Sequence, residues 1–175
     1  MRAFSDESER ANLMLLGVLL VPEATVVPAR RELRGMLLAG QRRVHTAKES
    51  PSRRRLLLDI IAGLDVAGLV FSVRRPAGVN RAAVRHQLLE AAALVLVERN
   101  VRSWVLDRQD PAQANRDRHT IAAALGRNDP LTYEHQASSE EPLLWAVDGL
   151  VWAYGAGGDW RRRVEGLIEA RELRP

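Results

Sequence analysis

The sequence contains no cysteine, no long apolar run and only one lysine among its 175 residues. Without cysteine, disulfides, zinc–thiolate sites and cysteine nucleophiles are excluded. The longest apolar run, Leu13–Val21, is about half the length that a membrane-spanning helix needs. The first residues lead into acidic side chains and not into the apolar core of a signal peptide. We therefore expect a cytoplasmic protein with no membrane partner.

The basic residues are almost all arginine. Lys48 is the single lysine among 26 basic residues, which exceed the 22 acidic residues by four. Guanidinium groups stay charged and match the oxygens of a phosphate. A GC-rich genome would produce the same preference, and so small a surplus does not by itself indicate nucleic-acid binding. The P-loop, Gly-x-Gly-x-x-Gly, Gly-x-Ser-x-Gly and His-Glu-x-x-His motifs are all absent.

Strand and helix patterns alternate along the chain. Strands are predicted at residues 3–5, 13–21, 68–73, 101–106 and 131–135, and the first two form a hairpin around a turn at 7–12. Helices are predicted at 29–38, 51–63, 81–99, 111–125, 140–154 and 159–168, with Ser50, Asn80, Asp110 and either Ser138 or Ser139 as caps. This order predicts one α/β domain over residues 1–175, with a mixed sheet and helices on both faces.

Acidic residues at strand ends carry the clearest chemical signal. Asp6 and Glu7 follow the first predicted strand, and Asp107 ends the strand at 101–106, where open α/β sheets bind ligands. Asp148 interrupts an apolar helical stripe, and Gly149 beside it permits a close approach by another element. Each aspartate also has a structural explanation, as a turn residue or as a buried ion-pair partner.

A fourth acid, Glu49, precedes a predicted helix start, where a carboxylate also favours the helix dipole. If Glu49 and the three aspartates converge, each pair repels by about 1 kcal/mol at 4 Å in water and by about 4 kcal/mol at an effective dielectric of 20. Such a cluster needs divalent cations, and oxygen ligands suit two Mg²⁺ or Mn²⁺ ions.

Several segments also resemble a known family. They are Ala3-Phe4-Ser5-Asp6-Glu7-Ser8 with the apolar strand after it, His45-Thr46-Ala47-Lys48-Glu49, Trp104-Val105-Leu106-Asp107 and the helical segment from Ala146 to Trp152. Together they resemble the prokaryotic domain-of-unknown-function family numbered thirty-eight hundred over nearly the whole chain. Glu9 stands where that family typically has glycine, so the turn after the first strand is expected to differ.

The resemblance implies a ribonuclease H-like fold and a metal-dependent nuclease. It places Asp6, Glu49, Asp107 and Asp148 as catalytic and metal-binding acids, with Glu7 as a substitute for Glu49. In the resulting hypothesis, Asp6 bridges two Mg²⁺ or Mn²⁺ ions and water attacks a phosphodiester of RNA or DNA. The alternative hypothesis is a non-catalytic ribonuclease H-like module that binds nucleic acid or a partner protein. The residues expected to hold the substrate backbone are Arg42, Arg43, Lys48, Arg53, Arg54, Arg55, Arg74 and Arg75, and His45 or His135 is expected to assist product release.

Overall fold

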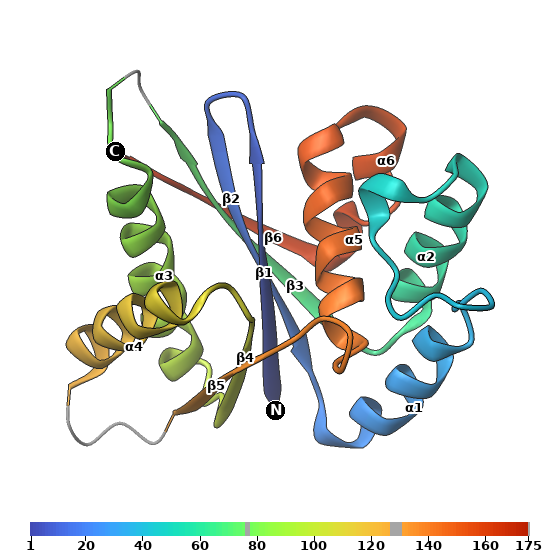
Figure 1. Ribbon diagram of the computed structural model, residues 1–175, viewed down its shortest axis with the longest axis horizontal. Helices are drawn as coiled ribbons and strands as arrows, with labels where there is room; N and C mark the ends of the chain where they lie inside the picture. Colours follow the sequence, from blue (N-terminus) through green and yellow to red (C-terminus); the bar gives the residue numbers. More distant parts are fainter. Residues whose placement is uncertain (76–77, 127–130, 175) are drawn as a thin grey trace.

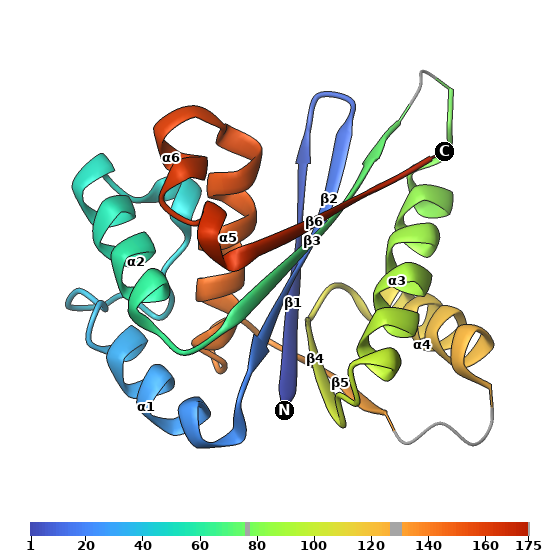
Figure 2. The ribbon, with the colours of Figure 1, turned by 180° about the vertical axis from the view of Figure 1, so that it is seen from behind.

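The computed structural model describes residues 1–75, 78–126 and 131–174, and Figures 1 and 2 show a central sheet between two layers of helices. The six strands follow the order β5-β4-β1-β2-β3-β6. Their bounds are β1 Arg2–Arg10, β2 Leu13–Val21, β3 Ala67–Arg74, β4 Ser103–Asp107, β5 Thr132–Gln136 and β6 Ile168–Leu173. The predicted α/β fold with a mixed sheet is confirmed.

One layer holds α1 (Glu23–Arg34), α2 (Pro51–Gly63), α5 (Leu143–Ala156) and α6 (Gly158–Arg162). The other layer holds α3 (Arg81–Glu98) and α4 (Pro111–Leu125). Two short 3-10 turns, η1 (Thr46–Lys48) and η2 (Glu165–Leu167), complete the described elements. Two apolar clusters, one on each side of the sheet, bury the two sets of helices against it.

The sheet is antiparallel in its centre and parallel toward both edges. β2 pairs antiparallel with β1 and β3, β4 pairs parallel with β1 and β5, and β6 pairs parallel with β3. β2 is apolar at every position because both of its faces are covered by helices. On β1, Phe4 packs on the α5 side and Ala3 on the α3 side, and this alternation decides where the polar residues of the strand point.

Three of the predicted helix starts are confirmed. The side chain of Ser50 accepts a hydrogen bond from the Arg53 amide, and that of Asp110 accepts one from the Gln113 amide. Asn80 caps α3 in the same way. At α5, however, neither predicted serine is the cap. That helix begins at Leu143 after Pro142, and the Glu141 carboxylate accepts the Leu143 amide.

The first hairpin is longer than predicted. β1 continues through Asp6 to Arg10, and the turn consists of Ala11 and Asn12. Glu9, in place of the expected glycine, lies within the strand and pairs with Arg75 and Arg81 at 3.2 and 2.8 Å. Pairing with the apolar β2 therefore extends the strand past the point where its own residues become polar.

Two further predictions were wrong. The first helix begins at Glu23 instead of residue 29, because Pro28 fits inside a helix at the cost of one hydrogen bond. The predicted helix at 159–168 ends at Arg162, and residues from Ile168 form β6 on the open edge of β3. Unpaired backbone groups at that edge outweigh the helix propensity of Glu, Ala, Arg and Leu. Within the described residues, no helix is both long enough and apolar enough to cross a membrane.

Candidate functional site

The register between β1 and β4 places two aspartates side by side. Ser5 pairs with Leu106 in this parallel ladder, so Asp6 and Asp107 are the next residue on each strand. Phe4, two residues before Asp6, packs in the cluster beneath α5. Because side chains alternate along a strand, Asp6 and Asp107 both face α5.

α5 lies close to the sheet at this level. Asp6 is opposite Gly17 on β2, and a Cβ built on Gly17 would lie 3.1 Å from Val151 and 3.2 Å from Val147 of α5. The missing side chain allows the helix to approach the strand. It thereby brings Asp148, the polar residue between those two valines, to the same side of the sheet as Asp6.

The three aspartates border one cavity of about 210 Å³. Asp6 comes from β1, Asp107 from the end of β4 and Asp148 from α5. The remaining wall consists of Glu7, Arg43, Val44, His45, Ser138, Leu144 and Trp145. Three of the four predicted acids therefore meet at one place, although they are separated by about a hundred and by about forty residues in the chain.

The cavity perturbs its carboxylates. Burial raises the pKa of Asp6 well above its ordinary value, and the negative charges of Asp107 and Asp148 raise it further. Burial also raises the pKa of Asp107, against the opposing positive charge of Arg43. Among the described residues, the buried Oδ1 atom of Asp107 has no hydrogen-bond partner. Buried carboxylates with raised pKa values concentrate at functional sites, which makes this cavity the candidate site.

A loop fixes the third aspartate. The amide of Thr46 donates to Oδ2 of Asp148 at 2.7 Å, and Nδ1 of His45 lies 3.3 Å from the same oxygen. Arg54 of α2 then holds the loop by donating to the carbonyl oxygens of Thr46 and Ala47, each at 2.8 Å. His45 and Arg54 were both predicted as site residues, and the structure places them at and just behind the cavity wall.

Glu49 does not join the aspartates. Its carboxylate accepts hydrogen bonds from Arg53 and from Gln41, and it does not border the cavity. Burial opposes its ionisation, but the hydrogen bonds from Arg53 and Gln41 outweigh burial and lower the pKa of Glu49. Among the other residues predicted to contact the substrate, Arg43 borders the cavity. Arg42 and Lys48 are exposed and do not border it.

The donor chemistry of the cavity fits a divalent cation. Carboxylate oxygens are the preferred ligands of Mg²⁺ and Mn²⁺, and Oδ1 of Asp107 has no hydrogen-bond partner among the described residues. A ready-made coordination shell is absent, however. Within residues 1–75, 78–126 and 131–174, no group of three or more His, Cys, Asp or Glu side chains is arranged to hold a metal ion.

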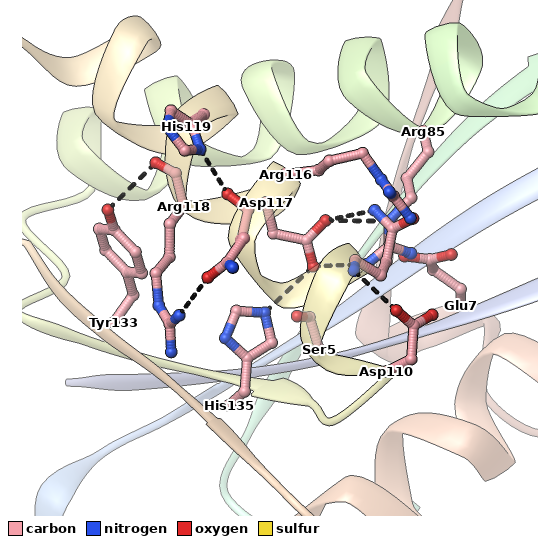
Figure 3. Close-up of polar contacts among 12 residues, drawn as sticks. Ser5, Glu7, Arg85, Asp110, Arg116, Asp117, Arg118, His119, Tyr133 and His135 are labelled. Atoms are coloured by element: carbon pink, nitrogen blue, oxygen red, sulfur yellow. Dashed lines mark hydrogen bonds and ion pairs between the residues drawn. The ribbon is translucent and has the colours of Figure 1, made fainter.

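The opposite face of β1 carries a buried polar network that the sequence analysis missed (Figure 3). Glu7 follows Asp6 and pairs with Arg85 of α3. Arg85 also donates to both oxygens of Asp117 on α4, at 3.0 and 2.7 Å. Nε2 of His135 lies 3.0 Å from the Asp117 carboxylate. His135 was predicted to assist the acids, but it lies across the sheet from Asp148.

Asp117 remains ionised in this network. Burial raises its pKa, but hydrogen bonds from His135, Arg85 and Gln113 outweigh burial and lower the pKa well below the ordinary aspartate value. A cavity of about 420 Å³ lies beside the network between α3 and α4, and it is larger than the aspartate cavity. We place the candidate site at the aspartates, because Arg85 already neutralises the one acid that borders the larger cavity. In the sequence, the signal for this network is Arg85, a charged residue among the apolar positions of α3.

Comparisons with solved structures show a similarity of fold. No family model and no curated protein matches the chain. A chain in the structure of the PCNA:RNase HII complex from Archaeoglobus fulgidus is similar, with a TM-score of 0.58 and 17% sequence identity. The similarity covers 95% of this chain and 75% of that chain. The fold is therefore ribonuclease H-like, as the sequence resemblance implied.

Proposed function

We propose that the protein is a nuclease that uses Mg²⁺ or Mn²⁺ to hydrolyse phosphodiester bonds of RNA or DNA. The observation that carries the proposal is the meeting of Asp6, Asp107 and Asp148 around one cavity, next to Arg43. Grouped carboxylates with raised pKa values destabilise the fold, and such groups concentrate at functional sites. The ribonuclease H-like fold agrees with this proposal but does not itself establish an activity.

Asp6 and Asp107 would hold the cations, with Asp148 as the third acid. Bound divalent ions supply positive charge at the reacting phosphate and lower the pKa of bound water. Arg43 holds a phosphate oxygen, and Trp145 and Leu144 keep bulk water from the inner wall. His45 lies beside the acids, and its contact with Asp148 orients the imidazole ring. Glu49 acts outside the cavity, because it anchors Arg53 at the start of α2.

Cleavage assays test this function directly. RNA, DNA and hybrid substrates are incubated with Mg²⁺, with Mn²⁺ and with EDTA, using wild type, Asp6→Asn and Asp107→Asn. We expect cleavage only with a divalent ion, and a loss of about 100-fold or more in each variant. Asp65→Asn, at an exposed position between α2 and β3 that borders neither cavity, is the matched control and keeps wild-type activity. Equal cleavage by Asp6→Asn and wild type, or undiminished cleavage in EDTA, would refute the proposal.

The second candidate function is a ribonuclease H-like module that binds nucleic acid without cleaving it. The observation that favours it is the lack, in the described part of the chain, of a preformed metal-binding group. Titration calorimetry with Mn²⁺ separates the two candidates. Binding that disappears in Asp6→Asn supports the nuclease, whereas salt-sensitive binding of oligonucleotides without any Mn²⁺ binding supports the module.

The finer family assignment also stays a proposal. We propose that the chain is one ribonuclease H-like domain of the family numbered thirty-eight hundred and that it acts in the cytoplasm. The segment from Asp6 to Ser8 and the segment around Asp148 support it, since both contribute an acid to the cavity. Sequences of relatives test this assignment. We expect them to retain Asp6, Asp107 and Asp148, which border the cavity, and to vary at Glu49, which does not.

A further inference from the structure

A second surface suited to nucleic acid lies beyond the aspartates along α5. Trp152 follows Asp148 by four residues on the same helix, so both side chains share one face. The ring of Trp160 on α6 meets that of Trp152 edge to face, with centroids 5.3 Å apart. The two tryptophans therefore extend the face of α5 that carries Asp148, away from the aspartate cavity.

Arginines lie next to both rings. The guanidinium of Arg54 lies 4.6 Å from the ring centroid of Trp152, and that of Arg10 lies 5.6 Å from it. Arg55 lies 5.9 Å from the ring centroid of Trp160. Arg54 is the same residue that holds the loop beneath Asp148, so the aspartate cavity and the tryptophans share a support.

Trp160 borders an open cavity of about 430 Å³. The other residues of its wall are Arg55, Arg162, Arg163 and one acid, Asp159. Asp159 pairs with Arg162, and Arg163 pairs with Asp59 at 2.7 Å. Among the described residues, Arg55 pairs with no carboxylate, and its guanidinium lies near the Trp160 ring. The cavity thus combines an aromatic ring with a surplus of positive charge.

We propose that Trp160 and Arg55 form a platform for an unpaired nucleotide of the strand that reaches the aspartate cavity. An indole stacks on any base, and a free guanidinium holds the neighbouring phosphate. The rise along α5 from Asp148 to Trp152 is about 6 Å, so the tryptophans begin about one helical turn from the aspartate cavity. The proposal rests on the proposed function, because it extends the substrate path of the same site. Positive charge favours a polyanion over an apolar peptide.

Oligonucleotide binding tests the platform without any cleavage. Fluorescence anisotropy in EDTA measures the affinity of a labelled single strand of about ten nucleotides, and of an abasic strand with the same number of phosphates. We expect Trp160→Ala to weaken binding of the intact strand by about 5- to 150-fold. We expect it to leave binding of the abasic strand unchanged. Trp160→Phe retains a ring against Trp152 and restores part of the affinity.

Arg55→Gln tests the charge. Loss of one phosphate contact should make the slope of log affinity against log salt shallower by about 0.7. Arg118→Gln on α4, in the opposite layer, removes the same charge from an exposed side chain and should leave the slope unchanged. Thermal melting confirms that each variant is folded. A structural role alone would not change the salt dependence.

The outcomes are distinct from those of the cleavage assay. Equal binding of intact and abasic strands, or an unchanged affinity in folded Trp160→Ala, overturns the platform. Competition by polyglutamate as effective as that by an oligonucleotide of equal charge assigns the surface to an acidic protein and also overturns it. If wild type binds through Trp160 but cleaves nothing, the nuclease proposal fails while the platform stands. If Asp6→Asn abolishes cleavage but Trp160→Ala leaves binding unchanged, the nuclease proposal stands and the platform fails.

Discussion

The buried pair between Arg85 and Asp117 offers the sharpest test of the far side of the sheet. The variant Asp117→Ala removes the acid that links α4 to α3 and to β5. Arg85 is 4% exposed and Asp117 is 1% exposed, so neither charge can be satisfied by water in the folded protein. The variant leaves Arg85 with Glu7 as its remaining acidic partner, and it deprives His135 of its acceptor.

The expected loss follows from those contacts. Removing one member of a buried ion pair costs about 3–5 kcal/mol, and the remaining pairing with Glu7 favours the lower end of that range. His135 adds to the loss, because its side chain is only 4% exposed and its Nε2 atom loses its partner. We expect the free energy of unfolding to fall by about 3 kcal/mol, which lowers the melting temperature by roughly 6–12 °C for a chain of this size.

Urea denaturation followed by circular dichroism measures the loss. Asp159→Ala is the matched control, since it also breaks an arginine–aspartate pair but one whose side chains are 67% and 85% exposed. We expect that control to cost less than about 1 kcal/mol. An Asp117→Ala loss no larger than the control would refute the view that burial makes this pair important.

The pH dependence of the same variant has a defined sign. The pKa of Asp117 is lowered in the folded state, so its contribution is complete above the ordinary aspartate pKa of about 3.9. That contribution is lost as the pH falls toward the lowered pKa of the folded state. The difference in stability between wild type and Asp117→Ala should therefore be largest above about pH 5 and should shrink in acid. A difference that grows in acid would contradict the assigned direction.

Two further variants test the aspartate side. Asp6→Asn should increase the free energy of unfolding at pH 7, because burial and two neighbouring acids raise the pKa of Asp6 and so oppose the charge that the variant removes; urea denaturation without divalent ions measures the gain, and a loss would contradict it. Gly149→Val should cost about 1–3 kcal/mol, because a Cβ there meets Leu57 at 2.9 Å. Thermal melting compares it with Gly63→Ala, where nothing lies within 4 Å and little change is expected.

Much of the site could be predicted from local pattern. Asp107 was placed at a strand end, and the parallel register then fixes it next to Asp6. Asp148 was recognised because a carboxylate interrupts an apolar stripe, and the predicted close approach at Gly149 comes from Leu57 of α2. The position of Glu49 could also be predicted from local pattern, because an arginine four residues later on α2 offers it a nearer partner than the cavity does.

The errors come from interactions between distant segments. β6 has the composition of a helix, and only the open edge of β3, about a hundred residues earlier, makes it a strand. The pairing of Arg85 with Asp117 likewise joins two helices, and the apolar neighbours of Arg85 on α3 do not identify Asp117 as its partner. Local propensity cannot report either contact, because neither is made by neighbours in the chain.

Two adjacent acids of β1 show how one strand contributes both to the stability of the fold and to the candidate site. Asp6 and Glu7 point to opposite faces because side chains alternate, and their surroundings treat the two charges in opposite ways. Glu7 meets Arg85, so its charge is neutralised within the fold. Asp6 meets two further carboxylates, so its charge is opposed within the fold. The first arrangement holds α3 and α4 against the sheet, and the second leaves a cavity in which three aspartates face one arginine, Arg43. A rigid, internally balanced face behind β1 is what allows the strand to keep Asp6 in a position that the fold itself disfavours.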